Sequence, residues 1–180
     1  MRTEVRFSAF GGQGIILAGV ILGEAAIIDG NNAVQSQSYG PESRGGSAKS
    51  EVIISDDDID YPMVIKADCF VTLSQPGFEK YSQNIKSGAT VIIDSDLVDG
   101  QKPDGAGSFY SLPLAITADK LGNRIFANIV MLGAFCAITN VVNKDNLVQS
   151  VKKYVPERFF EQNLEAFNEG FTLGQNALKS

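Results

Sequence analysis

The chain has 180 residues, of which 44% are hydrophobic and 20% are charged, so it is long and apolar enough to fold as one globular domain over residues 1–180. Its net charge of −6 argues against nucleic acid as a partner, because neutralising phosphates needs a basic surface. The absence of histidine excludes catalytic triads that use an imidazole base, together with the usual zinc sites.

Two cysteines and an acidic turn are the remaining candidates for redox or metal chemistry. Cys69 and Cys136 lie far apart, each in an apolar run, so we expect buried thiols that form neither a CxxC site nor an iron–sulfur cage within one chain. The four aspartates at positions 56, 57, 58 and 60 lack the spacing of a calcium loop, which favours a solvated turn over a cation site. We therefore predict no metal site and no catalytic residue on this chain alone.

The termini and the uncharged stretches bear on where the protein resides. Residues 1–4 lead directly into a strand-like run without the features of a signal peptide, so we expect a cytoplasmic protein. Of the two uncharged stretches, 7–23 is interrupted by glycines and 125–143 carries four polar residues, so no membrane span is predicted. An apolar helix in such a protein is usually buried, sometimes against a partner subunit.

Short runs of apolar and β-branched residues predict strands, and longer apolar segments predict helices. Up to residue 85 we expect a strand over 5–10, a helix over 15–28, strands over 33–38 and 49–54, a short helix opening at Tyr61–Pro62, a strand over 69–73 and a helix ending near 85. Thereafter we expect strands over 89–93 and 109–112, then helices over 114–121, 125–142, 145–154 and 156–177.

This alternation predicts an α/β fold, namely a three-layer Rossmann-like sandwich with a largely parallel sheet and a helical C-terminal region. Ligands of such sheets bind beyond the carboxyl ends of the strands. The turn over 11–14 follows the first strand, so we expect it at that edge of the sheet. The turns over 74–77 and 94–96 are further candidates for the same edge.

The turn Gly11-Gly12-Gln13-Gly14, preceded by Ala9, approximates the dinucleotide fingerprint G-x-G-x-x-G, whose glycines let the backbone approach a pyrophosphate. The fingerprint also needs an acid about 20 residues later to hold a ribose. Residues 33–38 contain no acid, which disfavours NAD binding. Two interpretations stay open: a strand-to-helix turn built for close packing, and contact with a ligand or partner through backbone N–H groups and the Gln13 amide.

The segment 38–46 is the second irregular one, with three glycines, a proline, an acid and a base within nine residues. Such a composition favours a shaped loop, and shaped loops often carry binding groups. We expect this loop and the glycine turn to face a ligand or a partner. The candidate residues are Gly11, Gly12, Gln13, Gly14, Tyr39, Gly40, Pro41, Glu42, Ser43, Arg44, Gly45 and Gly46.

Over almost its whole length the chain resembles the gamma subunit of 2-oxoacid:ferredoxin oxidoreductases. The resemblance rests on the following segments: Gly11–Gly14, Ser38–Gly46, Asp68, Leu121–Asn123, Asn128 and Asn163–Gly170. The Tyr-Gly-Pro-Glu form of the loop is most similar to the 2-oxoglutarate type. One departure is Ala9, where the family commonly has glycine, and its methyl group disfavours very close approach of a ligand at that position.

The resemblance implies a multi-subunit enzyme that converts a 2-oxoacid, coenzyme A and oxidised ferredoxin into acyl-CoA, carbon dioxide and reduced ferredoxin. It implies alpha, beta and ferredoxin-like partner subunits that hold thiamine diphosphate, Mg²⁺ and iron–sulfur clusters, with no cofactor bound by this chain alone. A homodimer of the isolated chain is a further expectation. Two other functions stay as alternatives: a stand-alone Rossmann-like nucleotide-binding module, and a purely structural subunit of the same complex.

Arg44 and Tyr39 each have two interpretations that stay open. The planar guanidinium of Arg44 suits bidentate binding of a phosphate or a substrate carboxylate. The alternative is an ion pair with Glu42 or with an acid of a partner, which would only fix the loop. Tyr39 suits either stacking on a ligand or packing at an interface.

Overall fold

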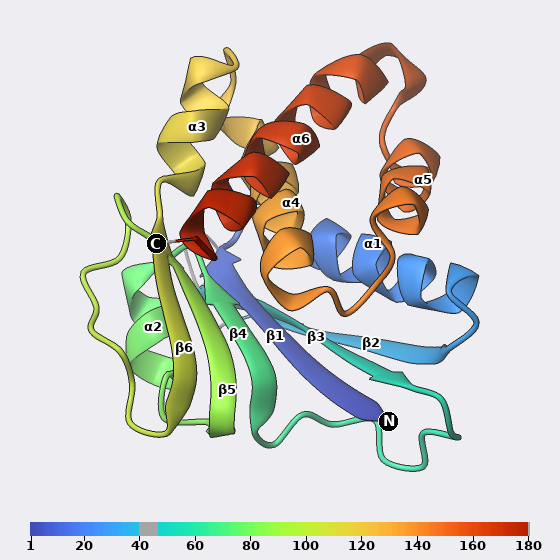
Figure 1. Cartoon of the computed structure of the whole chain (residues 1–180), viewed down its shortest axis with the longest axis vertical. Coiled ribbons are helices and arrows are strands. Elements are labelled where there is room, and N and C mark those ends of the chain that lie inside the picture. Colours follow the sequence, from blue (N-terminus) through green and yellow to red (C-terminus); the bar gives the residue numbers. More distant parts are fainter. Residues whose placement is uncertain (40–46, 180) are drawn as a thin grey trace.

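A six-stranded sheet forms the centre of the molecule in a computed structural model that describes residues 1–39 and 47–179 (Figure 1). The strands are β1 (Arg2–Phe10), β2 (Asn32–Tyr39), β3 (Ser47–Ser55), β4 (Ala67–Thr72), β5 (Ile85–Asp94) and β6 (Ala106–Leu112). They lie in the order β2-β3-β1-β4-β5-β6. Strands β1, β4, β5 and β6 run parallel, and β3 is antiparallel to both of its neighbours. The predicted, largely parallel sheet is confirmed.

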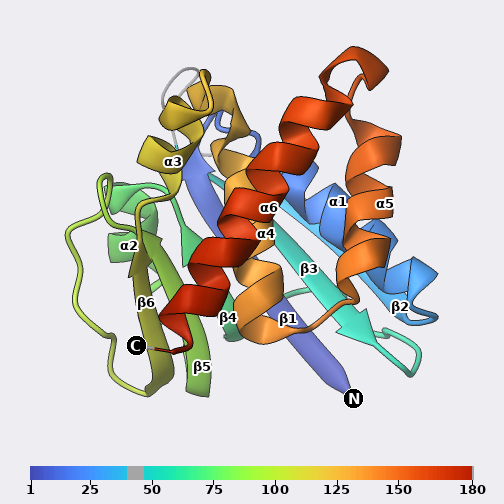
Figure 2. The same ribbon diagram turned by 45° about the horizontal axis from the view of Figure 1, so that its top comes forward.

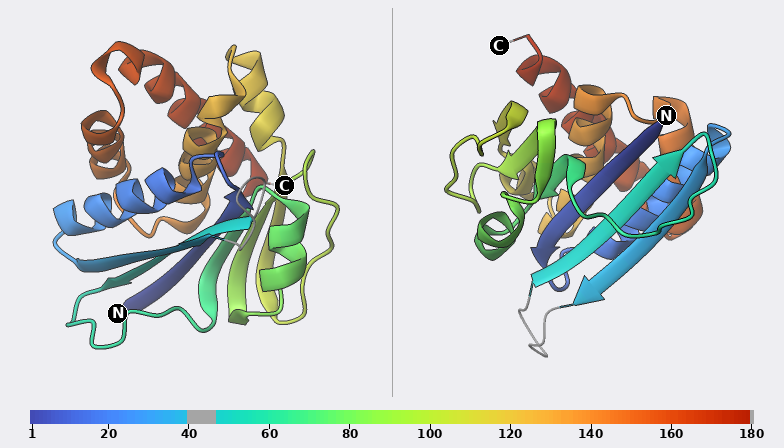
Figure 3. Two further views of the ribbon diagram at one scale, coloured as in Figure 1. Left: turned by 180° about the vertical axis from the view of Figure 1, so that it is seen from behind. Right: turned by 90° about the horizontal axis from the view of Figure 1, so that it is seen from below.

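Helices cover both faces of the sheet, but unequally. The described helices are α1 (Ile15–Ile28), α2 (Gln75–Tyr81), α3 (Leu114–Lys120), α4 (Ala127–Thr139), α5 (Lys144–Tyr154) and α6 (Phe160–Ala177), with 3-10 turns η1 (Arg124–Phe126) and η2 (Glu157–Phe159). Helices α1, α4, α5 and α6 gather over one face (Figure 2). Helix α2 packs on the opposite face and is seen in front of the strands from behind (Figure 3). None of the helices within the described ranges is long and apolar enough to cross a membrane.

The alternation of side chains along β1 separates two cores. Val5, Phe7 and Ala9 point into the larger core under α1 and α4, where the Phe7 ring meets the Phe135 ring edge-on at 5.4 Å between centroids. Two glycines let α4 and α6 approach each other closely: a Cβ on Gly133 would overlap the carbonyl oxygen of Phe167, and one on Gly170 would overlap that of Val130. Hence these helices pack backbone against backbone.

The face under α2 mixes apolar side chains with buried charge. Phe70 and Val91 form part of an apolar cluster there. Beside it, buried Arg6 donates from Nε to Glu51 Oε1 at 2.7 Å and from its two other nitrogens to the carbonyls of Asn84, at 3.0 Å, and Val64, at 2.7 Å. The guanidinium therefore ties two loops to the sheet from within the core.

Several predicted element boundaries are wrong. The segment after Tyr61–Pro62 has no helix, because the carbonyls of Tyr61 and Val64 accept hydrogen bonds from Arg2 and Arg6 instead of helical N–H groups. The helix expected to reach residue 85 ends at Tyr81, since residue 85 already pairs with β4. The helices expected to open at 125 and 156 each begin with a 3-10 turn, η1 and η2.

Candidate functional site

The carboxyl edge of the sheet brings the glycine turn beside Tyr39. The turn after β1 lies at this edge, beside the end of β2 and the start of β3, where Phe10 pairs with Ser47 and Tyr39 with Ala48. Tyr39 is 66% exposed. The candidate residues Gly40, Pro41, Glu42, Ser43, Arg44, Gly45 and Gly46 lie outside the described residues.

Internal bonds and packing account for the sequence of the glycine turn. Gln13 donates its backbone N–H to the Phe10 carbonyl at 3.2 Å, and its side-chain Oε1 accepts from the Phe10 N–H at 2.7 Å. Gly12 and Gly14 have φ values of 92° and 72°, in the left-handed region that favours glycine. A Cβ on Gly14 would also overlap the side-chain amide of Asn128. Thus the Gln13 oxygen, a candidate ligand contact, closes the turn.

An apolar groove of about 380 Å³ opens beside this turn. Its lining residues are Gly12, Gly14, Leu17, Asn123, Ile125, Phe126, Asn128, Ile129, Val155, Pro156, Phe159 and Asn163. They come from the start of α1, from η1 and α4, and from η2 and α6. The groove therefore gathers residues from four of the segments that carry the family resemblance, and none of these described lining residues is charged.

Hydrogen bonds fix the orientation of the asparagines in the groove. Asn128 donates its Nδ2 to the Gly14 carbonyl at 3.2 Å, and Asn163 donates its Nδ2 to the Phe159 carbonyl at 2.8 Å. A carbonyl accepts only from the nitrogen end of a carboxamide, so each Oδ1 must face the other way. Asn123 instead uses its Oδ1 to cap η1 by accepting from Ile125 N–H at 2.9 Å. The sequence alone gave no sign that these side chains converge.

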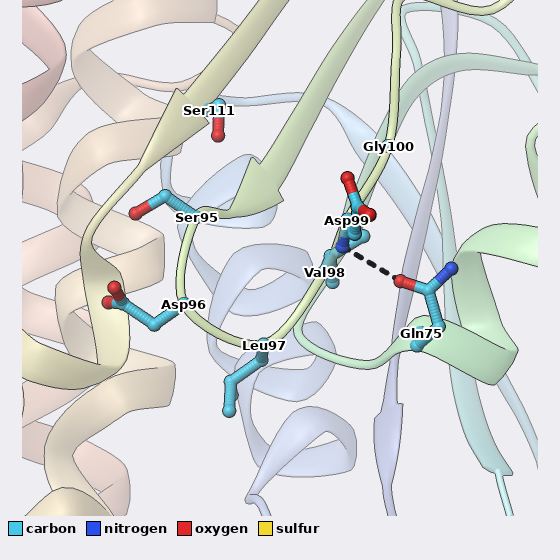
Figure 4. A pocket seen from close by; sticks show the side chains of 8 residues that line it. All are labelled: Gln75, Ser95, Asp96, Leu97, Val98, Asp99, Gly100 and Ser111. Atoms are coloured by element: carbon cyan, nitrogen blue, oxygen red, sulfur yellow. Dashed lines mark hydrogen bonds between the residues drawn. The ribbon is translucent and has the colours of Figure 1, made fainter.

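A second, polar hollow of about 660 Å³ lies along the same edge at the ends of β5 and β6 (Figure 4). Gln75 Oε1 accepts from the Asp99 N–H at 2.8 Å and joins α2 to the β5–β6 connection. At the end of β5, buried Asp94 accepts from the N–H groups of Asp96, Leu97 and Ala115. Burial raises the pKa of Asp94 above its usual range. These contacts give Asp94 a role in holding the turn over 94–96 in place.

A family model described as pyruvate ferredoxin/flavodoxin oxidoreductase matches residues 4–173. The chain belongs to this family. It is 49% identical over 178 residues to the 2-oxoglutarate synthase subunit KorC of Methanocaldococcus jannaschii, covering 97% of this chain and 95% of that one. It is 44% identical to the subunit of the same name from Methanothermobacter marburgensis, covering 94% and 95% of the two chains.

Solved structures agree with this assignment. The gamma subunit of a keto/oxoacid ferredoxin oxidoreductase from Geobacter sulfurreducens superposes with a TM-score of 0.85 at 46% identity, covering 97% of this chain and 99% of that one. A 2-oxoglutarate:ferredoxin oxidoreductase from Magnetococcus marinus gives a TM-score of 0.87 at 25% identity, covering 99% of this chain but 32% of that chain. The resemblance to gamma subunits is confirmed, and the chain is a subunit of a multi-subunit 2-oxoacid oxidoreductase.

The cysteines of this family member lie in the core, as expected. Both are free and buried. Burial raises the pKa of Cys69 to about 12 and that of Cys136 to about 11, so both stay protonated thiols near neutral pH. Within residues 1–39 and 47–179, no three acidic or cysteine side chains lie close enough together to hold a metal ion.

Proposed function

We propose that this chain is the gamma subunit of an oxidoreductase that acts on 2-oxoglutarate. The enzyme would convert the 2-oxoacid, coenzyme A and oxidised ferredoxin into acyl-CoA, carbon dioxide and reduced ferredoxin. Two observations support the substrate: the two relatives named above are 2-oxoglutarate synthase subunits, and the loop after Tyr39 has the form that resembles the 2-oxoglutarate type.

The convergence of separate sequence segments at the carboxyl edge carries the proposal for how the chain contributes. Gly12, Asn128 and Asn163 meet in one groove, although Gly12 and Asn163 are 163 − 12 = 151 positions apart in the sequence. Among the described residues that line this groove and the hollow beside β5, no hydrogen bond pairs a nucleophile with a base. Such an edge suits the completion of a site whose reacting groups belong to other chains.

The remaining partners and cofactors follow from the same proposal. Alpha and beta subunits would hold thiamine diphosphate with Mg²⁺, a ferredoxin-like subunit would hold iron–sulfur clusters, and coenzyme A would enter as co-substrate. The chain would work in the cytoplasm as one domain, and its isolated form would be a homodimer. The glycine turn and Tyr39 would face the partner subunits, with Arg44 contacting either an anion or a partner acid.

Coexpression with the natural partner subunits tests this function. The complex should reduce a viologen dye in a reaction that depends on coenzyme A, faster with 2-oxoglutarate than with pyruvate, 2-oxoisovalerate or indolepyruvate. Preference for another 2-oxoacid would overturn the substrate. Omitting this chain should abolish the reaction, whereas an assembled complex that keeps its rate without it would make the chain purely structural.

Calorimetric titration of the isolated chain tests the alternative of a stand-alone nucleotide-binding module. NAD and ATP should give no binding heat at concentrations up to about 1 mM. A dissociation constant of about 1 mM corresponds to a binding free energy of only about −4 kcal/mol, so any binding site for these nucleotides would be detected. Micromolar binding of either nucleotide would favour the stand-alone module over the gamma subunit.

A further inference from the structure

We propose that the apolar groove beside the glycine turn receives an uncharged, extended polypeptide segment of an adjoining subunit, whose backbone N–H groups donate to Asn128 and Asn163. This inference rests on the proposed function, because it assumes that the chain works inside a complex. It adds the chemistry of the contact: apolar side chains in the groove, and amide donors facing two carboxamide oxygens.

The groove contains two carboxamide oxygens that can accept hydrogen bonds. Asn128 and Asn163 are only 5% and 6% exposed, and each has its Nδ2 committed to a backbone carbonyl. Among the described residues neither Oδ1 has a hydrogen-bond donor. Ser8 Oγ alone among the described side chains is a buried polar atom without a partner, so both Oδ1 atoms reach solvent in the open groove. An occupant that displaces this solvent must supply donors in its place, because covering an acceptor without a donor costs free energy.

Large apolar side chains stand exposed at the rim of the groove. Ile125 is 66% exposed and Phe159 is 39% exposed, and both border the groove. Large apolar side chains that stand together in water mark interaction sites, and a partner that covers them gains from the burial. Because none of the described residues that line the groove is charged, its chemistry favours a neutral occupant over a carboxylate or phosphate.

Two relatives indicate a source for the occupant. In the Magnetococcus marinus enzyme the matching fold takes up 32% of a longer chain, and in the ketoisovalerate oxidoreductase subunit VorA of Methanothermobacter thermautotrophicus the match takes up 28% of its length. In both proteins this fold is joined covalently to additional polypeptide. Further polypeptide thus accompanies this fold in both proteins, and the N–H groups of such polypeptide would supply the donors that the asparagines need.

Filling or charging the groove tests the inference in the coexpressed complex. Leu17→Trp narrows the groove and Ile125→Lys places a charge on its rim, and each should weaken binding of the chain to its partner subunits by about tenfold or more. Ile27→Lys is the matched control, because Ile27 is also exposed, at 55%, but lies at the far end of α1. Wild-type affinity of both groove variants, measured by biolayer interferometry on folded protein, would overturn the proposal.

The acceptors need a separate pair of variants. Asn163→Ala removes one carboxamide from the groove, and Asn168→Ala removes an exposed one from the same helix. We expect weaker partner binding, by about fivefold to twentyfold, only for the first, as for the loss of one buried hydrogen bond. Circular dichroism and thermal melting establish that the variant is folded. Equal affinities for the two variants would contradict the role of the acceptor.

A photo-crosslinking residue identifies the occupant. With p-benzoylphenylalanine in place of Ile125, irradiation of the complex should join this chain to one partner peptide that is apolar and free of charged side chains. Labelling of coenzyme A, of a charged segment, or of no partner would overturn the inference. If the unmodified chain fails to assemble with the partners at all, the proposed function fails; if it assembles and crosslinks elsewhere, only the inference fails.

Discussion

The two faces of the sheet use different means to hold their layers together. Under α4 and α6 the core is apolar, and helices meet through Gly133 and Gly170 with backbone against backbone. Under α2 the layer is thin, and buried Arg6 holds Glu51 and two loop carbonyls. The thick face therefore depends on shape, whereas the thin face depends on three hydrogen bonds from one guanidinium.

The largest expected effect is the loss of that guanidinium. Arg6→Met should lower the free energy of unfolding by about 3–5 kcal/mol, because Glu51 Oε1 and the carbonyls of Asn84 and Val64 all lose their donor, although Lys49 still pairs with Glu51. Urea denaturation measures the change. Arg2→Ala is the control: its pair with Glu4 is partly exposed and should contribute about 1 kcal/mol or less. A similar loss in both variants would contradict the contrast between the two faces.

The next effect tests the shape of the thick face. Gly170→Ala should cost about 1–3 kcal/mol, because the added methyl overlaps the Val130 carbonyl and forces α6 away from α4. Gly23→Ala in α1 is the matched substitution, since its Cβ would meet nothing nearer than Val52 at 4.0 Å. There alanine should be neutral or stabilising, as helix propensity favours it over glycine. Thermal melting of both variants compares them, and equal melting temperatures would sink the idea of close packing.

A smaller effect concerns the carboxyl edge, where Asp94 holds a turn. Burial raises the pKa of Asp94 in the folded state, so the folded protein binds this proton more tightly than the unfolded chain does. This group therefore favours folding below its unfolded pKa, and that contribution falls as pH rises through its folded pKa. The difference in unfolding free energy between the wild type and Asp94→Asn should vary in this direction over that window. A difference that does not change with pH would exclude the shift.

The smallest effect is chemical and needs no loss of stability. With thiol pKa values raised by burial to about 12 and about 11, Cys69 and Cys136 should resist iodoacetamide at pH 8 in the folded protein. Both should react rapidly in denaturant, and intact-mass spectrometry counts the modified groups. Fast labelling of the native protein would show that one of the two faces opens more readily than the packing implies.

The prediction from sequence was accurate where the pattern is local. The apolar run from Ile15 to Ile28 and the β-branched run around Val91 predicted the helix and the strand that the structure contains. It was wrong at Tyr61–Pro62, where two arginines from a distant strand take the carbonyls. Boundaries failed for the same reason, because they depend on partners that lie far away in sequence.

The candidate site divides in the same way. The turn at Gly12 and Gly14 was predictable from the glycines themselves and from their place between a strand and a helix, since a left-handed backbone conformation favours glycine whatever surrounds it. The groove was not, because Asn128 and Asn163 show their common purpose only when α4 and α6 bring them beside the turn. Local backbone preferences thus determined the elements and their order, while the meeting of residues more than a hundred positions apart depended on how the helices pack on the sheet.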